Sequence, residues 1–131
     1  MKTVFSLMFV CSVFVPAQTT QEFPETSGNA FVRLCSAVEK HKTTDEESAH
    51  AISCIGYVAG FMDGVSVYPS FAEAKTKQKV PELFCRPERV EHGQIVSIAL
   101  KYIRNHPEEA HHPTQLLIMV ALGEAFPCPS K

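Results

Sequence analysis

The chain has 131 residues, of which 45% are hydrophobic and 20% are charged, and its formal net charge at neutral pH is −2. Charges of both signs are mixed along the sequence, without a long run of like charges. Such a chain offers no basic patch to nucleic acid and no polybasic segment to an anionic membrane surface. We therefore expect neither nucleic-acid binding nor membrane insertion.

The first 17 residues have the organisation of a secretory signal peptide. Lys2 carries a positive charge, a mainly apolar run covers 4–15, and Val15-Pro16-Ala17 supplies a small-residue cleavage site. The apolar run is shorter than the roughly 20 residues that span a bilayer as a helix. We predict that 1–17 is removed and that the mature chain is exported.

The mature chain of 114 residues is long enough for one compact domain but not for two. Residues 18–27 are polar and are predicted to form an extended leader to a domain over 28–131. Four cysteines remain, and an even number in an exported chain predicts two disulfides. They lack the tight C-x-x-C spacing of a zinc site. These cysteines are Cys35, Cys54, Cys85 and Cys128.

Helical periodicity predicts the first two elements. Apolar residues recur with the spacing of one helix face over about 28–42, and Ser27 or Thr26 stands at the N-cap position. Thr44 and Glu47 have the spacing of a capping box, in which each side chain bonds the backbone amide of the other residue. A second helix is therefore predicted to begin there.

Three glycines lie in this second helix. Gly64 is expected to end it, because glycine is common just after a helix C-terminus. Gly56 and Gly60 lie one turn apart, and each weakens a helix by up to about 1 kcal/mol relative to alanine. We expect another helix to approach closely at these two positions. Asp63 and the polar first half of the helix argue against a lipid-spanning helix.

The next segment, 65–84, has no sustained period and contains two prolines, so it is predicted as a long connection with a short helix near 70–76. A third helix is predicted to open with Pro87 at its first position and to end near 104–106, before Pro107. A fourth helix runs from Pro113 to about residue 126. It is apolar all round, which predicts a place at the centre of the bundle.

These elements predict an all-α fold, a small disulfide-stapled four-helix bundle built from two helical hairpins. Cys35 and Cys54 lie at nearly equal distances from the turn of the first hairpin, so they are expected to face each other. Cys85 precedes the third helix and Cys128 follows the fourth, which brings both to the open end of the second hairpin. The predicted disulfides are Cys35–Cys54 and Cys85–Cys128.

Few residues suggest chemistry. His106, His111 and His112 share a proline-bounded turn that is able in principle to hold a transition metal. A polar turn beside a helix C-terminus explains the same residues without a metal, and we predict no metal and no cofactor. The acid–base pair on offer, Asp63 with His92 or His106, is not brought together by any motif, so no catalytic residue is predicted.

Four motifs together carry a resemblance to a known family over about 28–128. They are Cys54-Ile-Gly-Tyr-Val-Ala-Gly-Phe-Met-Asp-Gly64, Phe84-Cys-Arg-Pro87, His106-Pro-Glu108 and Ala-Leu-Gly-Glu-Ala-Phe-Pro-Cys128. The chain resembles the Tai/Rap immunity proteins, periplasmic antidotes to peptidoglycan amidase toxins delivered by the type VI secretion system of Gram-negative bacteria. The resemblance implies a periplasmic, all-helical, disulfide-bonded homodimer that catalyses no reaction, binds a secreted amidase effector and blocks its substrate cleft.

Blocking a cleft requires a protruding, semi-rigid segment, and 65–84 meets that requirement best. Its aromatic residues are of the type that dominates interface energetics, although they also suit a simple covering of helix ends. The predicted partner-binding residues are Tyr68, Pro69, Ser70, Phe71, Lys75 and Lys77. The alternatives are a periplasmic ligand-binding or chaperone-like helical protein with an apolar groove, and a metal binder that uses the histidine turn.

Overall fold

The fold is that of a computed structural model, which describes residues 27–129. The predicted signal peptide, 1–17, and the predicted leader, apart from Ser27, lie outside the described residues. The described chain is all-helical, without a strand, which confirms the predicted all-α, disulfide-stapled four-helix fold. Its elements are α1 (Gly28–Cys35), the 3-10 helix η1 (Ser36–Glu39), α2 (Asp45–Thr76), α3 (His92–Asn105) and α4 (Thr114–Ala125).

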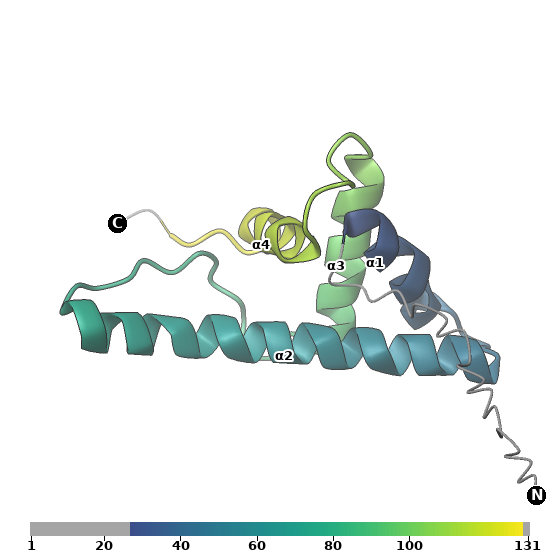
Figure 1. The fold of residues 1–131 in the computed structure, drawn as a ribbon, viewed down its shortest axis with the longest axis horizontal. Helices are drawn as coiled ribbons and strands as arrows, with labels where there is room; N and C mark the ends of the chain where they lie inside the picture. The colour runs from purple at the N-terminus through teal and green to yellow at the C-terminus, as the bar shows by residue number, and fades with distance from the viewer. Residues whose placement is uncertain (1–26, 130–131) are drawn as a thin grey trace, which may run out of the picture.

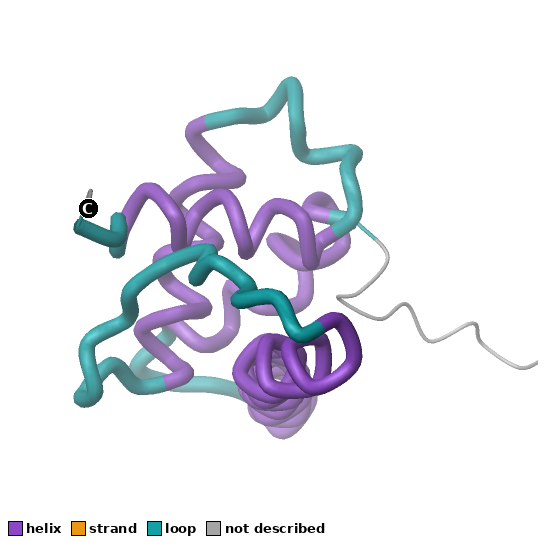
Figure 2. Tube along the Cα trace, turned by 90° about the vertical axis from the view of Figure 1, so that its left-hand side faces the viewer, coloured by secondary structure: helices purple, strands orange, loops and turns teal. Residues whose placement is uncertain are grey.

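The helix at the centre is α3, which packs against α1, α2 and α4 (Figure 1). In Figures 1 and 2, α2 runs along one edge of the molecule. The prediction that the fourth helix is central is wrong, because Leu116 and Val120 of α4 are 47% and 37% exposed. An apolar composition all round did not distinguish a central helix from one that covers a single side of α3. The largest fully buried side chains are Phe31, Ile95, Leu100, Leu117, Ile118 and Leu122.

The caps of the first hairpin are those that the sequence predicts. The Ser27 side chain accepts a hydrogen bond from the Ala30 amide at 3.3 Å, which starts α1. Thr44 and Glu47 form the capping box of α2, with distances of 3.2 and 3.0 Å. The first helix is shorter than predicted, because it tightens into η1 after Cys35 instead of continuing to residue 42.

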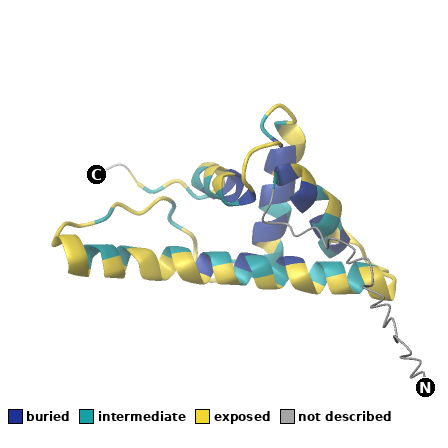
Figure 3. Cartoon of the chain, viewed as in Figure 1, coloured by how far each residue is buried: buried dark blue, intermediate teal, exposed yellow. Residues whose placement is uncertain are grey.

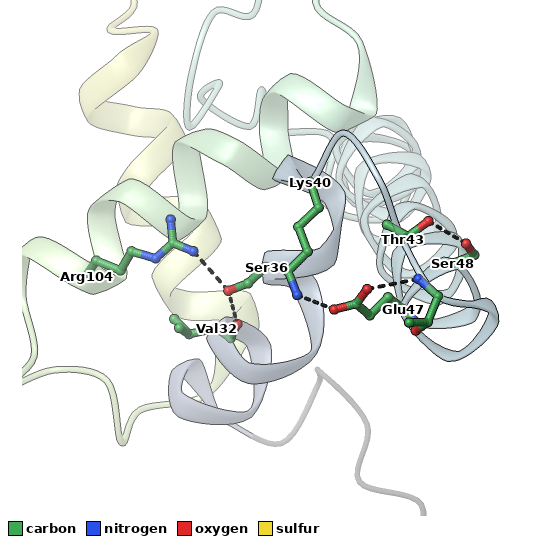
Figure 4. Close-up of polar contacts among 8 residues, drawn as sticks. Val32, Ser36, Lys40, Thr43, Glu47, Ser48 and Arg104 are labelled. Atoms are coloured by element: carbon green, nitrogen blue, oxygen red, sulfur yellow. Dashed lines mark hydrogen bonds and ion pairs between the residues drawn. The ribbon is translucent and has the colours of Figure 1, made fainter.

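Polar contacts join the hairpin to its neighbours (Figure 4). Lys40 forms an ion pair with Glu47, which holds the pKa of that carboxyl below its usual value. Arg104, near the end of α3, donates to Ser36 at 2.9 Å and to Glu39 at 2.8 Å. The end of α3 is therefore tied to η1, and the start of α2 is tied to Lys40, the residue that follows η1.

The end of α2 differs most from the prediction. The helix passes Gly64 and Pro69 and ends at Thr76, so a connection beginning at residue 65 is wrong. No described glycine has a positive φ, so Gly64 does not take the left-handed conformation of a C-terminal glycine. Instead Lys77, with φ 58°, closes the helix, and its amide donates to the Glu73 carbonyl at 2.9 Å.

The third helix also begins later than predicted, at His92 instead of Pro87. A separate turn occupies the intervening residues, in which the Val90 amide donates to the Pro87 carbonyl at 3.3 Å. Arg86 also donates to the Val90 carbonyl at 2.8 Å. The helix ends at Asn105, two residues before Pro107, and α4 begins just after Pro113, as the prolines predict.

Both predicted disulfides are confirmed. The Cys35–Cys54 bond joins α1 to α2 with a Cα–Cα distance of 5.5 Å, and both residues are fully buried. The Cys85–Cys128 bond joins the segment before α3 to the segment after α4, with a Cα–Cα distance of 4.8 Å. The Cys85 amide also donates to the Phe126 carbonyl at 2.8 Å, so backbone pairing supports this second bond.

Only one face of α2 contributes to the core, through Cys54, Val58 and Met62. Among the described residues, α2 is also the helix whose length and composition alone would suffice to cross a membrane; 17% of its most apolar window is buried. Its capping box and the exposed Asp63 are features of a helix in water. The absence of membrane insertion stays a prediction.

Candidate functional site

Five of the six predicted partner-binding residues lie on an arm, which we define as the last part of α2, residues 65–76, and the sixth, Lys77, is the C-cap that follows it. The arm continues past α3 and carries mainly exposed residues (Figures 1 and 3). Tyr68 and Phe71 are 62% and 61% exposed, and Val67 is 64% exposed. The interpretation in which these two aromatic side chains merely cover helix ends is therefore wrong. The arm presents apolar surface outward instead.

The arm is helical, so it holds these residues more rigidly than the predicted connection would. Pro69 lies inside the helix, where it removes one backbone donor but leaves the helix continuous. Ser66, one turn before, and Thr76, at the end, each donate to a carbonyl of the preceding turn at 2.8 Å. Ser70 lies on the same helical segment and is exposed. A helical rod has a defined diameter of about 10–12 Å with its side chains.

Basic residues gather at the tip of the arm. The Lys75 ammonium lies 5.8 Å from the centre of the Phe71 ring, within the range of a cation–π contact. Lys77 follows as the C-cap, and Lys79 lies two residues further on, both exposed. Positive charge at a helix C-terminus is favourable because the carbonyl ends of the helix dipole are negative. The tip therefore combines an aromatic ring with exposed lysines.

The segment after the arm returns to the bundle and is fastened at both ends. At the tip, the Glu73 carboxylate accepts a hydrogen bond from the Val80 amide at 3.1 Å. At the base, Cys85 is bonded to Cys128. Leu83 lies between these points and is 57% exposed. The arm and its return segment thus form one projecting hairpin-like unit, and in Figure 1 the return segment leaves the C-terminal end of α2 and runs back above it.

The glycines in α2 have surroundings other than those predicted from the sequence. A Cβ built on Gly56, Gly60 or Gly64 would meet nothing within 4 Å, so no other helix among residues 27–129 approaches them. The expected close approach of a helix is wrong within the described chain. These glycines lie opposite the buried face of α2. A signal was present in the sequence, because Cys54, Val58 and Met62 recur at four-residue spacing and mark one face of the helix, the face that the structure buries.

A hollow of about 250 Å³ lies between α3 and α4, at the end of α3. Tyr102 donates a hydrogen bond to Glu109 at 2.8 Å, and this bond raises the pKa of Tyr102 to about 12. His106 stacks on Tyr102 with ring centres 4.2 Å apart, and its Nδ1 lies 2.9 Å from the Tyr102 carbonyl oxygen. These groups fasten the turn between α3 and α4. The raised pKa keeps the Tyr102 hydroxyl neutral, and a neutral tyrosine is a poor nucleophile.

The histidine turn does not form the metal-ligand group that the alternative interpretation requires. The rings of His111 and His112 are tilted by 35° with their centres 4.1 Å apart, and both residues are exposed. Within the described residues, the three potential ligands that converge to within 4.8 Å are Glu82, Cys85 and Cys128. Both cysteines of that group are consumed by a disulfide, so neither offers the thiolate that binds metal.

Comparison with known proteins covers this whole described fold. Residues 27–128 match the family model of the Rap1a immunity proteins. Neither a curated protein nor a solved structure matches the chain. The matched range includes all four helices, both disulfides and the arm with its return segment.

Proposed function

Because the chain belongs to the Rap1a immunity protein family, we propose that it is a periplasmic immunity protein that binds a type VI secreted peptidoglycan amidase effector and occludes its active-site cleft. Membership confirms the family resemblance seen in the motifs, and an immunity family implies a partner effector protein. The match over residues 27–128 is the observation that carries the proposal. The amidase target, the homodimer and the periplasmic location are proposed from the resemblance and the predicted signal peptide.

The arm suits occlusion of a cleft. A helix is narrow enough to enter a groove, and Tyr68 and Phe71 offer aromatic side chains of the kind that anchors protein interfaces. Because the arm is already helical and its return segment is tied by the Cys85–Cys128 bond, little conformational freedom is lost on binding. Inhibition by occupancy requires no catalytic residue, and the protein is proposed to act without catalysis.

The basic tip favours an effector whose active-site cleft has an acidic rim. Lys75 and Lys77 are exposed and would accelerate association with an acidic rim around the effector's cleft. Their contribution is a rate effect that weakens as salt screens exposed charges. Aromatic contacts, by contrast, act on the dissociation rate.

The test is titration of the purified, oxidised protein into candidate type VI amidases, with peptidoglycan hydrolysis as the readout. Inhibition at a fixed molar ratio is expected, and Tyr68→Ala is expected to weaken it at least tenfold, the effect of a hot-spot aromatic of about 2 kcal/mol. Leu116→Ala is the matched control, because Leu116 is 47% exposed but lies on α4. Unchanged hydrolysis with every amidase would contradict the proposal. Suppression of the aggregation of several unrelated unfolded proteins to a similar extent would favour the chaperone-like alternative.

A further inference from the structure

The disulfide at the base of the return segment has a carboxylate beside it. Glu82 Oε2 lies 3.1 Å from Cys85 Sγ and 4.0 Å from Cys128 Sγ. The sulfurs of a disulfide carry no proton, so neither donates a hydrogen bond to this carboxylate. The contact becomes favourable when the sulfurs carry protons or when a cation lies between the three groups. The position of Glu82 therefore suits the reduced form of this cysteine pair better than the disulfide.

The three ligand atoms have the spacing of a zinc site. They all lie within 4.8 Å of one another. In tetrahedral coordination, Zn–S bonds of about 2.3 Å and Zn–O bonds of about 2.1 Å place sulfur and oxygen about 3.6 Å apart and two sulfurs about 3.8 Å apart. The two sulfur–oxygen distances, 3.1 and 4.0 Å, lie on either side of that value. Once the bond is broken, side-chain rotation is enough to bring the two sulfurs to their separation.

The backbone keeps the two cysteines close to each other without the bond. The Cys85 amide donates to the Phe126 carbonyl at 2.8 Å, two residues before Cys128. A Cβ on Gly123 would lie 3.8 Å from the Leu83 carbonyl oxygen, in ordinary van der Waals contact, so the return segment also passes close to α4. Ligands held in place in this way lose little conformational freedom when they bind an ion.

This disulfide is also the more accessible of the two. Cys85 and Cys128 are partly exposed, whereas Cys35 and Cys54 are fully buried. Thiol–disulfide exchange requires a thiolate to reach a sulfur, so a small dithiol is expected to open Cys85–Cys128 first. In that reaction the dithiol passes two electrons to the bond, its own sulfurs close to a disulfide, and both cysteines become thiols. Zn²⁺ then displaces one proton from each thiol.

We propose that Glu82, Cys85 and Cys128 form a zinc site in the reduced protein, and that the ion replaces the disulfide as the tie between the return segment and the segment after α4. Thiolate and carboxylate are both zinc ligands, and thiolate sulfur favours zinc over magnesium or calcium. Glu82 is exposed, so a water can complete the site as the fourth ligand. The base of the return segment thus stays closed under both oxidising and reducing conditions.

Thiol mapping tests which bond opens. The purified, oxidised protein is treated with a limiting amount of dithiol under argon, alkylated and mapped by peptide mass. The alkyl label is expected on Cys85 and Cys128, with the Cys35–Cys54 bond still closed. Label on Cys35 and Cys54 ahead of the other pair would overturn the proposed access and, with it, the site.

Cobalt tests the ligand set. After removal of the dithiol under argon, the selectively reduced protein is expected to bind one Co²⁺ per chain with the sulfur-to-metal charge-transfer absorption of thiolate ligands, and to release it to Zn²⁺. Glu82→Gln is expected to weaken Co²⁺ binding at least tenfold. Glu88→Gln is the matched control, because Glu88 is exposed before α3 but lies outside the group of three ligands.

Two results of the cobalt titration would overturn the site. Equal affinity of Glu82→Gln and the wild type would remove the carboxylate from the ligand set. Binding without the charge-transfer absorption would place the ion on other side chains, such as those of the histidine turn.

Thermal unfolding tests whether the ion replaces the bond. Zn²⁺ is expected to raise the melting temperature of the selectively reduced protein, to raise it less in Glu82→Gln, and to leave the oxidised protein unchanged. An equal rise in the oxidised and reduced proteins, or no rise in either, would contradict the replacement. None of these measurements uses an effector, so their outcome is independent of the immunity proposal.

Discussion

At the scale of single residues, the Tyr102 hydroxyl offers the clearest test. Its bond to Glu109 closes the turn between α3 and α4 and raises its pKa to about 12. Tyr102→Phe is expected to lower the free energy of unfolding by about 1 kcal/mol at neutral pH. Because the pKa is raised in the folded state, this stabilisation is complete below the unfolded value near 10 and disappears as pH rises through about 12.

The measurement is urea unfolding of the wild type and Tyr102→Phe at neutral and alkaline pH, with tyrosinate absorbance as a second readout. The wild type should show one late ionisation that the variant lacks. Tyr68→Phe serves as control, because its exposed side chain should change stability by less than about 0.5 kcal/mol. Ionisation of all three tyrosines well below pH 12 would show that the Glu109 bond does not persist in solution.

At the scale of elements, the end of α2 is set by one strained residue. Lys77 adopts φ 58°, a left-handed conformation that costs a residue with a Cβ about 1–2 kcal/mol. Lys77→Gly is expected to stabilise the end of the arm by about 0.5–1 kcal/mol, because glycine takes this conformation without strain. Hydrogen exchange at the amides of Lys77 and Val80, which both bond to Glu73, should slow several-fold.

Lys79→Gly is the control for this change. Among the described non-glycine residues, Lys77 is the one with a positive φ, so glycine at residue 79 relieves no strain and adds only chain flexibility. Exchange at the arm tip should be unchanged or faster in that variant. Slower exchange in both variants would mean that loss of a lysine charge, and not the backbone conformation, controls the end of the helix.

The same helix shows where reasoning from sequence succeeds at this scale. Thr44 and Glu47 predicted the start of α2 because a capping box satisfies backbone amides locally. Gly64 and Pro69 led to a wrong prediction of its end, because both residues are usual at helix ends. A helix continues through either residue when the turns before and after it keep their backbone hydrogen bonds. The exposure of the arm could not be predicted, since it depends on where α2 lies relative to α3.

At the scale of the whole molecule, the two disulfides should differ in what their removal costs. Loop-closure entropy gives about 3 kcal/mol for Cys35–Cys54 and about 4 kcal/mol for Cys85–Cys128, in a model-dependent estimate. Serine at the fully buried Cys35 and Cys54 also places hydroxyls in an apolar core, at a further 1–3 kcal/mol or so each if they are unpaired. The shorter loop is therefore expected to be the more damaging one to open.

Thermal unfolding in oxidising buffer checks this order. Cys85→Ser, Cys128→Ser and the double variant should lose the same stability, because either single change already breaks the bond. The Cys35→Ser, Cys54→Ser double variant should lose more than the Cys85, Cys128 pair. Additive losses for Cys85 and Cys128 would mean that these residues are not bonded to each other in solution.

The pairing of neighbouring cysteines has a topological consequence. One disulfide closes a covalent ring over residues 35–54 and the other closes a ring over 85–128, and the two rings do not interlock. The arm and its return segment, within 55–84, thus belong to the single stretch of chain that joins two parts of the molecule, each closed by its own disulfide. One tryptic cut at the exposed Lys75, Lys77 or Lys79 would leave two fragments that separate on a non-reducing gel. The segment proposed to bind the effector is therefore also the segment whose cleavage divides the molecule into two covalently separate parts.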